Sequence, residues 1–449
     1  MQTIREPERE TPVVHEADLV VVGGSCTGVF AAVRAARLGL SVAIIEKQNC
    51  FGGVATAGAV NVWHKLYDTA NEQPIIGGLT SEVLDRLEKR DAVLAPKGPK
   101  GAFRLNTEEL KIELDELVVE HDIKPFLHSF FVAPALESER LEGVVIENKN
   151  GRQAILGRYF VDATGDGDLA RHLGLPLHAP ESLQPPTTCA KLYGMATMGE
   201  FDWLAAVREH GAEFGLEPDW GWGGPTPGLP DIQMRADNHM FGADASDAEQ
   251  LTRIEIDGRR KVRAVIDLLR KYGPPGSSIS LVDLAATAGI RETRRVAARY
   301  CLTGDDVLYG RRFDDAIANG SYPVDIHHSE GTGITFRMLD GTERVVPERG
   351  LPAKTGRWRD PLPEGDPTFY QVPLRSITPE GVPNLVLSGR MLDADKVAFS
   401  AVRVMVNTNQ TGEAAGVAAA LAMEENSPVG DVDPQQVRQT LADGGSVIL

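Results

Sequence analysis

A short apolar run that leads into a glycine-rich turn is the feature that most constrains how this chain folds. Residues 19–22 read LVVV, and residues 23–28 read GGSCTG. A segment rich in alanine follows, which allows a helix to lie close to a sheet, and residues 41–45 form a second apolar run. A buried strand, a tight turn, a helix and a second strand are the parts of a βαβ unit. The fold class we expect is therefore α/β, with a Rossmann-like parallel sheet.

The turn between the two strands has the residue types of a dinucleotide-binding site. Gly23 allows the tight turn, and Gly28 lets the helix approach the strand, while Ser25 stands where a third glycine is usual. Serine is small, and we expect its hydroxyl to donate to a phosphate oxygen. The helix N-terminus adds free N–H groups and a positive potential that favour phosphates. The contacts predicted in this unit are Gly23, Gly24, Ser25, Cys26, Thr27, Gly28, Glu46 and Lys47.

The end of the second strand indicates which nucleotide is bound. Glu46 stands there and is expected to accept hydrogen bonds from a ribose hydroxyl. Lys47 follows it and would suit a ribose 2′-phosphate, but the neighbouring acid opposes that choice. We therefore expect a nucleotide without a 2′-phosphate.

Composition excludes several classes of partner. The 449 residues carry a net charge of −18, which disfavours a nucleic-acid partner or an anionic membrane. The polar N-terminus has no apolar core of a secretory signal, and no apolar run is long enough to span a membrane. Four scattered cysteines without a CxxC pair suit a reducing cytoplasm and predict neither a disulfide framework nor a metal site.

The order of motifs predicts three segments. Residues 14–178 form the first part of the nucleotide-binding domain, including a β-hairpin that turns at residues 150–151. Residues 179–381 lack a second βαβ pattern and are expected to be an inserted α+β substrate domain, with helices at 249–272 and 281–288. Residues 382–449 return to the first domain through an apolar strand, a connecting segment and a helix of small residues that we expect to pack on the first sheet.

Several separated stretches together resemble the FAD-dependent oxidoreductases of the glutathione-reductase-like, two-dinucleotide-domain class. They read DLVVVGGSCTG, IIEKQNCFGG, VDATGDGD, NLVLSGRMLDAD and GEAAGVAAALA. The resemblance implies FAD in an extended pose, with backbone N–H groups of residues 403–412 aimed at the flavin ring. The further FAD contacts that it implies are Gly52, Gly53, Val54, Val132, Ala163, Thr164, Gly165, Asp166, Gly389, Arg390, Asp393, Arg403 and Gly412.

Two departures from that class affect the expected chemistry. Its disulfide reductases carry a redox cysteine pair in the loop after Gly53, where this chain reads VATAGAVN. Disulfide reduction by that route is therefore not expected, and Cys50 is interpreted as a buried small residue. The segment before the last helix, MVNTNQTG, is rich in amides, which weakens any analogy for the substrate.

The catalytic candidates lie in three short stretches. A general base near the flavin is required for hydride removal from a C–OH or C–N centre, and His327 or His328, beside Asp325, is the first choice. His64 is the second choice. Arg291 lies in GIRETRR, interpreted as a helix, and would clamp a carboxylate, although pairing with neighbouring acids explains it equally well. A tryptophan–glycine cluster at residues 220–223 is a further candidate, as a substrate platform or as packing.

These observations lead to one expected function with two alternatives. We expect a cytoplasmic FAD-dependent oxidoreductase that transfers a hydride between a small polar organic substrate and the flavin. The alternatives are a flavin-dependent isomerase or hydratase without net redox, and a non-catalytic flavin-binding module. The sequence leaves the electron acceptor and any homo-oligomer open, and it offers no built-in NAD(P)H site.

Overall fold

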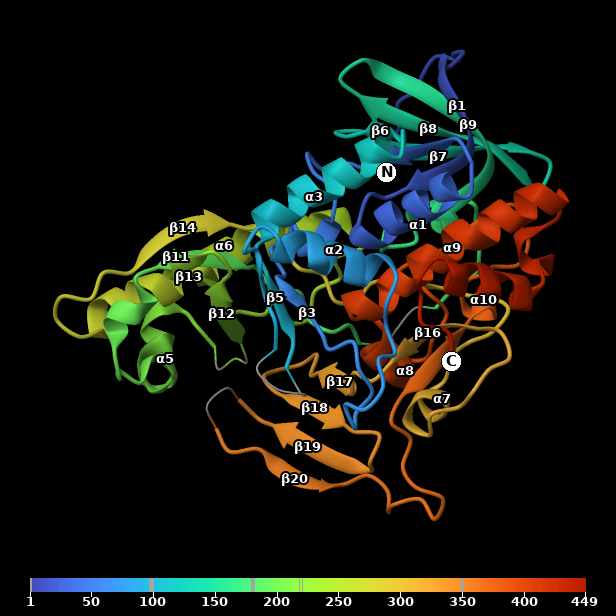
Figure 1. The fold of residues 1–449 in the computed structure, drawn as a ribbon. Helices are drawn as coiled ribbons and strands as arrows, with labels where there is room; N and C mark the ends of the chain where they lie inside the picture. Colours follow the sequence, from blue (N-terminus) through green and yellow to red (C-terminus); the bar gives the residue numbers. More distant parts are fainter. Residues whose placement is uncertain (1, 97–100, 179–181, 218, 220, 349–350) are drawn as a thin grey trace.

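A seven-stranded sheet organises the upper part of the molecule in Figure 1. The computed structural model describes residues 2–96, 101–178, 182–217, 219, 221–348 and 351–449. The sheet runs in the order β6-β2-β1-β9-β8-β7, with β22 also paired to β9. Its strands are β1 (Val13–Val22), β2 (Val42–Ile45), β6 (Lys124–Phe126), β7 (Phe130–Glu137), β8 (Arg140–Asn148), β9 (Gly151–Asp162) and β22 (Leu385–Leu387). Strands β6, β2, β1, β9 and β22 are mutually parallel, which confirms the predicted α/β fold class.

Strand β1 lies in the middle of this sheet because both of its faces are apolar. Leu19 and Val21 belong to the core on one face, and Val20 and Val22 belong to the core on the other. The long strand β9 pairs with β8 along its first half, which forms the predicted hairpin, and with the short strand β22 at its end. This change of partner places the chain after β22 beside the chain after β9.

Helix α1 (Cys26–Arg37) covers one face of the sheet and packs against α9 (Met405–Glu425), as Figure 1 shows. Two glycines of α9 make this contact close, since a Cβ at Gly412 or Gly416 would overlap the carbonyl oxygen of Thr27 or Ala31. The small-residue helix α9 therefore packs mainly on helix α1, whereas the sequence led us to expect packing on the first sheet. The buried Arg34 and Glu413 form an ion pair across the same interface, with Arg34 Nε 2.7 Å from Glu413 Oε2.

The middle of the chain forms two antiparallel sheets. One has the order β12-β13-β11-β14 and lies beside α5 and α6, and the other has the order β17-β18-β19-β20. Their strands are β11 (Ala190–Tyr193), β12 (Trp222–Thr226), β13 (Leu229–Ala236), β14 (Ser280–Leu284), β17 (Val324–His327), β18 (Ile334–Arg337), β19 (Thr342–Val346) and β20 (Lys354–Arg357). The boundaries predicted for the inserted domain stay a prediction.

Several sequence-based element assignments in this part need correction. The helix predicted at 249–272 is confirmed as α6 (Ala248–Tyr272), whereas the one predicted at 281–288 is wrong, because that segment begins in strand β14. Arg291 lies in an irregular segment that leads to β15 (Arg295–Val296), so the helix proposed for GIRETRR is absent. The connecting segment predicted before the last helix contains α8 (Lys396–Val402), and α9 begins six residues earlier than expected, at Met405.

The remaining elements are short and join these layers. The strands are β3 (Val62–Trp63), β4 (Val93–Leu94), β5 (Phe103–Leu105), β10 (Leu177–His178), β16 (Ala316–Gly320) and β21 (Tyr370–Pro373). The α-helices are α2 (Leu79–Glu88), α3 (Thr107–Glu120), α4 (Asp168–His172), α5 (Trp203–His210), α7 (Gly304–Leu308) and α10 (Pro434–Asp443). The 3-10 helices are η1 (Gly53–Ala55), η2 (Met195–Met198), η3 (Gly211–Phe214), η4 (Leu374–Ser376) and η5 (Val429–Asp431). Within the described residues, no helix has the length and apolar character required to cross a membrane.

Candidate functional site

The larger of two adjoining cavities lies at the carboxyl ends of the parallel strands. It has a volume of about 440 Å³ and is lined by Val22 and Ile45 at the ends of β1 and β2, and by Ala163 and Gly389 just after β9 and β22. The predicted contacts that line it are Gly23, Ser25, Cys26, Thr27, Glu46, Lys47, Gly52, Gly53, Val54, Ala163, Thr164, Gly165, Asp166, Gly389, Arg390 and Arg403. The carboxyl edge of a parallel sheet is where α/β proteins bind their ligands.

The turn at the start of α1 approaches this cavity closely because its glycines carry no side chain. Gly23 has φ +105° and lies against Ala163, and a Cβ at Gly28 would overlap the Gly23 carbonyl oxygen. The Ser25 hydroxyl caps α1 by accepting a hydrogen bond from the Gly28 N–H at 3.3 Å. A hydroxyl that accepts one hydrogen bond keeps its own proton to donate, so the contact of Ser25 with a phosphate oxygen stays a prediction, beside the N-terminal N–H groups of α1 as a second anion-binding feature.

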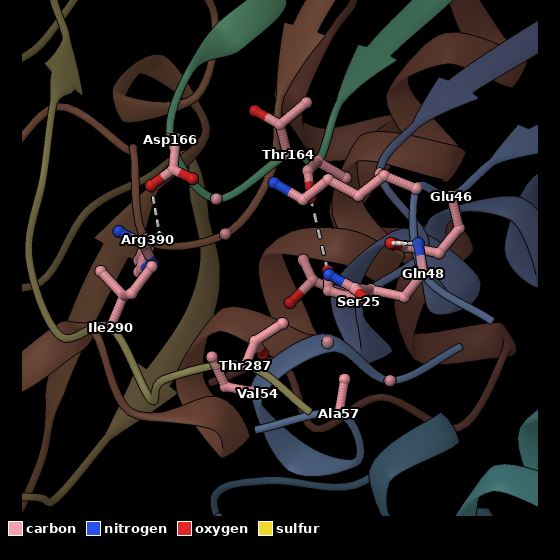
Figure 2. Close-up of a pocket in the computed structure, with 18 of the residues that line it drawn as sticks. Ser25, Glu46, Gln48, Val54, Ala57, Thr164, Asp166, Thr287, Ile290 and Arg390 are labelled. Carbon is pink, nitrogen blue, oxygen red and sulfur yellow. Dashed lines mark hydrogen bonds and ion pairs between the residues drawn. The ribbon is translucent and has the colours of Figure 1, made fainter. Parts of the chain in front are cut away.

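The carboxylate of Glu46 is held at the end of β2 by backbone donors. The Gly24 N–H donates to Oε2 at 2.7 Å and the Gln48 N–H donates to Oε1 at 2.8 Å. Burial raises the pKa of Glu46. Each carboxylate oxygen can accept a second hydrogen bond, so Glu46 can still receive a ribose hydroxyl. Figure 2 shows Glu46 and Gln48 side by side at one end of the cavity.

The loop after β2 forms the floor below the α1 turn. Gly52 has φ +106°, and its N–H donates to the Gly24 carbonyl at 2.8 Å, which holds the loop against the turn. Val54 and Ala57 then point into the cavity. The nearby thiols are inert, since burial raises the pKa of Cys26 to about 12 and that of Cys50 above its usual value.

An ion pair closes the opposite wall of the cavity. Arg390 Nη2 lies 2.5 Å from Asp166 Oδ1, and the Thr293 hydroxyl donates to the same oxygen at 2.7 Å. The Arg390 guanidinium helps hold the pKa of Asp166 below its usual value despite burial. In Figure 2 this pair faces the Glu46 end across the cavity.

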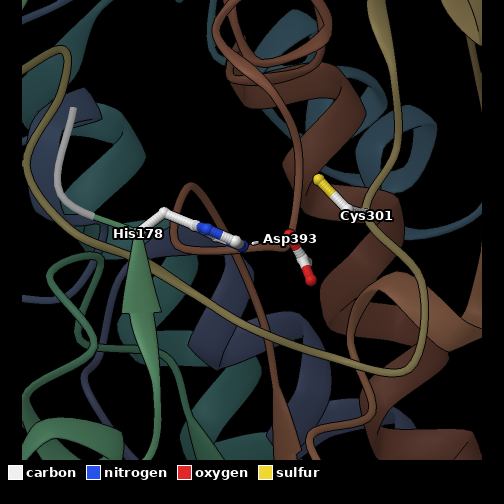
Figure 3. Close-up of side chains that lie close together, drawn as sticks. All are labelled: His178, Cys301 and Asp393. Atoms are coloured by element: carbon white, nitrogen blue, oxygen red, sulfur yellow. Dashed lines mark hydrogen bonds and ion pairs between the residues drawn. The ribbon is translucent and has the colours of Figure 1, made fainter. Parts of the chain in front are cut away.

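Five predicted contacts do not line this cavity. Three of the five are glycines that pack closely against other segments of the same chain, namely Gly24, Gly28 and Gly412. The fourth, Val132, follows two residues that do line the cavity, Phe130 and Phe131. Asp393 is placed elsewhere, as Figure 3 shows: its Oδ1 lies 2.8 Å from His178 Nε2, and the Ala298 N–H donates to Oδ2 at 2.7 Å. Asp393, His178 and Cys301 have their ligand-type atoms within 4.8 Å of one another, and burial raises the pKa of Cys301 to about 12.

Sequence reasoning missed the residues that the middle of the chain contributes. Leu251 and Glu255 of α6 line the larger cavity together with Thr287, Ala288 and Ile290. They carry no motif, and the two segments are joined by a hydrogen bond from the Ala288 N–H to Glu255 at 2.7 Å. The first turn of α9 was expected here and does line it, through Met405, Thr408 and Asn409.

The smaller cavity has a volume of about 300 Å³ and adjoins the larger one. Both are lined by Val54, Ile290, Arg390, Arg403 and Met405. The smaller cavity also brings together three of the four predicted catalytic residues, His64, Arg291 and His327. His64 lies more than 200 positions before the other two in the chain, and β3, the segment before β15, and β17 bring the three residues to one place.

The fourth candidate, His328, lies outside this cavity. Its Nε2 is 3.0 Å from the Thr335 hydroxyl, and it lines a separate, open depression with Ser329, Glu330 and Lys396. His327 ends β17 and borders both this depression and the smaller cavity, whereas His328 borders the depression alone. Only His327 of the pair therefore faces the smaller cavity.

A polar network centred on Asp325 lines one wall of the smaller cavity. The Tyr322 hydroxyl donates to Asp325 Oδ2 at 2.6 Å, Arg403 Nη2 lies 3.3 Å from the same oxygen, and His327 Nε2 lies 3.5 Å from Oδ1. Burial and the nearby Arg291 hold the pKa of His327 well below its usual value. Its imidazole is therefore neutral at pH 7.

His64 lies on the other side of the network. Burial lowers its pKa to about 3, and the charges of Arg403 and Arg104 act in the same direction. Arg104 reaches His64 because β5 pairs with β3, with Val62 opposite Arg104. Arg104 and Asp325 are site residues without a recognisable motif, and Trp222 of the predicted tryptophan cluster lines the same cavity, while Trp220 lies outside the described residues.

Comparisons with known proteins give one family match and several partial or distant similarities. A 50-residue stretch, 11% of this chain and 10% of the other, is 42% identical to dihydrolipoyl dehydrogenase from Manduca sexta. A geranylgeranyl bacteriochlorophyll reductase-like protein from Thermoplasma acidophilum is 13% identical with a TM-score of 0.47, covering 95% of this chain and 83% of that one. The flavin-dependent brominase Bmp2 is 12% identical with a TM-score of 0.45, covering 95% and 83%. The family model described as FAD dependent oxidoreductase matches residues 18–441, so the chain belongs to this family of enzymes, whose cofactor is FAD.

Proposed function

We propose that the larger cavity holds FAD and that the smaller cavity holds a small polar organic substrate, between which a hydride is transferred. The observation that carries this proposal is the shared wall of the two cavities. Five residues line both, and one of them, Met405, is the first residue of the 21-residue helix α9. A ring at this wall would face the substrate on one side and a helix N-terminus on the other.

The residues of the larger cavity fit FAD. The α1 turn has no side chain where Gly23 and Gly28 pack, so the N–H groups at the start of α1 are free to approach a pyrophosphate. Glu46 lines the same cavity at the end of β2 and would accept the hydroxyls of the adenosine ribose. FAD supplies the two-electron chemistry when bound, and the protein supplies orientation and charge. We infer that the order of these contacts follows the glutathione-reductase-like class.

We infer that His327 holds the proton that a substrate C–OH or C–NH group releases. Its imidazole is neutral and faces the smaller cavity, and Asp325 lies 3.5 Å from Nε2 to stabilise the charged form. Tyr322 and Arg403 fix the orientation of Asp325. Replacement of His327 therefore affects proton removal without disturbing the larger cavity.

Two alternatives share the same FAD site and differ in the smaller cavity. An isomerase or hydratase would bind substrate there without net reduction of the flavin, and a non-catalytic module would not need a chamber lined by His64, His327 and Asp325. The net charge of −18 supports a small-molecule substrate over a nucleic acid.

Anaerobic mixing of the purified protein with a panel of alcohols, amines and 2-hydroxy acids tests the proposal. Loss of the oxidised flavin absorbance on mixing is expected for at least one class of compound, and His327→Asn should slow it while His328→Asn should not. Turnover of a compound with the flavin oxidised throughout would favour the isomerase or hydratase. Release of a nucleotide other than FAD from the denatured protein would contradict the proposal at its first step.

A further inference from the structure

We propose that the substrate of the smaller cavity carries a carboxylate and that Arg104 and Arg291 bind it. This inference rests on the proposed function, because it names the chemical class of the molecule that reacts there. It follows from the balance of charge in the cavity, from an unsatisfied donor on Arg104, and from the apolar character of the remaining wall.

The charged groups that line the smaller cavity do not balance. Four arginines line it and one carboxylate, Asp325, does. Arg390 pairs with Asp166 and Arg403 pairs with Asp325. Among the residues that the structure describes, no carboxylate lies within 4.0 Å of Arg104 or Arg291, which leaves an excess of two positive charges.

Arg104 is the stronger of the two candidates. Its Nη1 is buried and has no hydrogen-bond partner within the described part of the chain. Its guanidinium lies 5.5 Å from the ring centre of Trp222, which holds it in place at the cavity wall. A buried charged donor without an acceptor costs free energy, and a ligand carboxylate would remove that cost.

Arg291 lines the same cavity from a different segment of the chain, the one that leads to β15. Its Nη1 donates to the Pro185 carbonyl at 2.8 Å, which fixes the plane of the guanidinium. Burial lowers the pKa of Arg291 to about 10, so the group stays charged at neutral pH. A planar guanidinium that is fixed in this way can bind a carboxylate through two parallel hydrogen bonds.

The rest of the wall indicates an organic anion and not an inorganic one. Val60, Val62, Ile334 and Phe336 line the cavity beside the arginines. An apolar wall stabilises a carbon skeleton by burying its apolar surface. The same wall offers no hydrogen-bond partner to the remaining oxygens of a phosphate or sulfate ion. The ligand class that fits is a carboxylate on a small, partly apolar body.

Binding of a carboxylate would also change the protonation of the two histidines. Arg104 and Arg403 lower the pKa of His64, and Arg291 and Arg403 lower the pKa of His327. His239, whose Nδ1 lies 2.6 Å from Asp219, and His328 act on His327 in the same direction, while the Asp325 carboxylate opposes them. A ligand carboxylate offsets the arginine charges, so it should raise both pKa values toward the range useful for a base.

Ligand titrations of the FAD-containing protein test this inference. Acetate, succinate and benzoate are compared with acetamide, succinamide and benzamide, followed by calorimetry and by changes in the flavin absorbance. At least one carboxylate should bind ten-fold or more tightly than its amide, and Arg104→Gln should remove that preference while Arg104→Lys retains part of it. Arg260→Gln, at a position of α6 whose side chain is 77% exposed, is the control and should bind as the wild type does.

The outcomes separate this inference from the proposed function. Equal binding of each acid and its amide, or tighter binding of inorganic phosphate than of any carboxylate, would overturn the inference while leaving the flavin chemistry intact. An Arg104→Gln variant that keeps its melting temperature, its FAD and its full preference for the acid would overturn the role of Arg104. Absence of FAD from the purified protein would instead contradict the proposed function, and calorimetry would still report whether the cavity prefers acids.

Discussion

The imidazole of His64 lies against the phenol ring of Tyr322, with ring centroids 4.1 Å apart and planes tilted by 41°. His64 follows strand β3 in the first part of the chain, and Tyr322 precedes β17 in the middle part. The Tyr322 hydroxyl donates to Asp325, so the contact joins the His64 side of the smaller cavity to the Asp325 network. The two sides of the smaller cavity are therefore joined by direct contact between segments that lie far apart in the sequence.

Replacement of Gly28 should abolish FAD binding. The Cβ of Gly28→Val would overlap the Gly23 carbonyl oxygen and force the α1 turn away from the sheet. We expect the variant to be purified without FAD, measured as flavin absorbance per chain. Gly356→Val is the matched control, because nothing lies within 4 Å of a Cβ there, and it should keep its flavin. Retention of stoichiometric FAD in Gly28→Val would argue against this turn as the binding site.

Replacement of His327 and of the adjacent His328 should have different effects. His327 faces the smaller cavity and His328 does not, so His327→Asn should slow flavin reduction by substrate about 10² to 10⁴-fold, the usual contribution of a general base. In His328→Asn the substrate should reduce the flavin at the wild-type rate. Both variants should keep the flavin absorbance spectrum. Stopped-flow absorbance under anaerobic conditions measures the rate. Similar rates of flavin reduction in the wild type and in His327→Asn would indicate that His64, and not His327, is the general base.

Stability should fall as the pH is lowered from about 6.5 toward 3, and His64 should contribute to that fall. The folded pKa of His64 is about 3 and its ordinary value is 6.5, so the unfolded chain binds more protons in this interval and lower pH favours unfolding. The slope from one such group is at most about 1.4 kcal/mol per pH unit.

His64→Phe should therefore flatten the dependence of the melting temperature on pH in that interval. The ring contact with Tyr322 is kept in this variant while the titrating group is removed. His128→Asn is the control, since His128 is exposed and its φ of +50° is one that asparagine tolerates. A pH dependence of His64→Phe as steep as that of the control would show that His64 is not buried in its neutral form.

Removal of the flavin should destabilise the protein, and FAD should restore stability better than FMN. FAD and FMN share the ring, but FMN lacks the adenosine half that would reach Glu46. A ligand at 100 times its dissociation constant adds about 2.7 kcal/mol to the free energy of unfolding. Differential scanning fluorimetry of stripped protein with each nucleotide measures the effect. An equal rise in melting temperature with FMN would mean that the Glu46 end of the cavity does not hold the adenosine.

The sequence predicted the larger cavity better than the smaller one. The contacts of the larger cavity follow directly after strands, and the ends of parallel strands meet at one edge, so local patterns such as GGSCTG predicted them. The smaller cavity depends on pairings between distant segments, such as β3 with β5, and nothing in the sequence near Arg104 indicates that it faces His64. Likewise, the position of α9 against α1 depends on Gly412 and Gly416 meeting Thr27 and Ala31, a relationship that no single stretch contains.

Electron density for FAD in a crystal structure of the loaded protein tests the central claim most directly. The account predicts the pyrophosphate at the N-terminus of α1, the adenosine ribose at Glu46, and the flavin ring at the wall shared by the two cavities, between Val54 and Met405. The smaller cavity, with His327 and Arg104, should then open onto one face of the ring. A flavin ring located in the smaller cavity itself, or at the Glu46 end, would contradict the account.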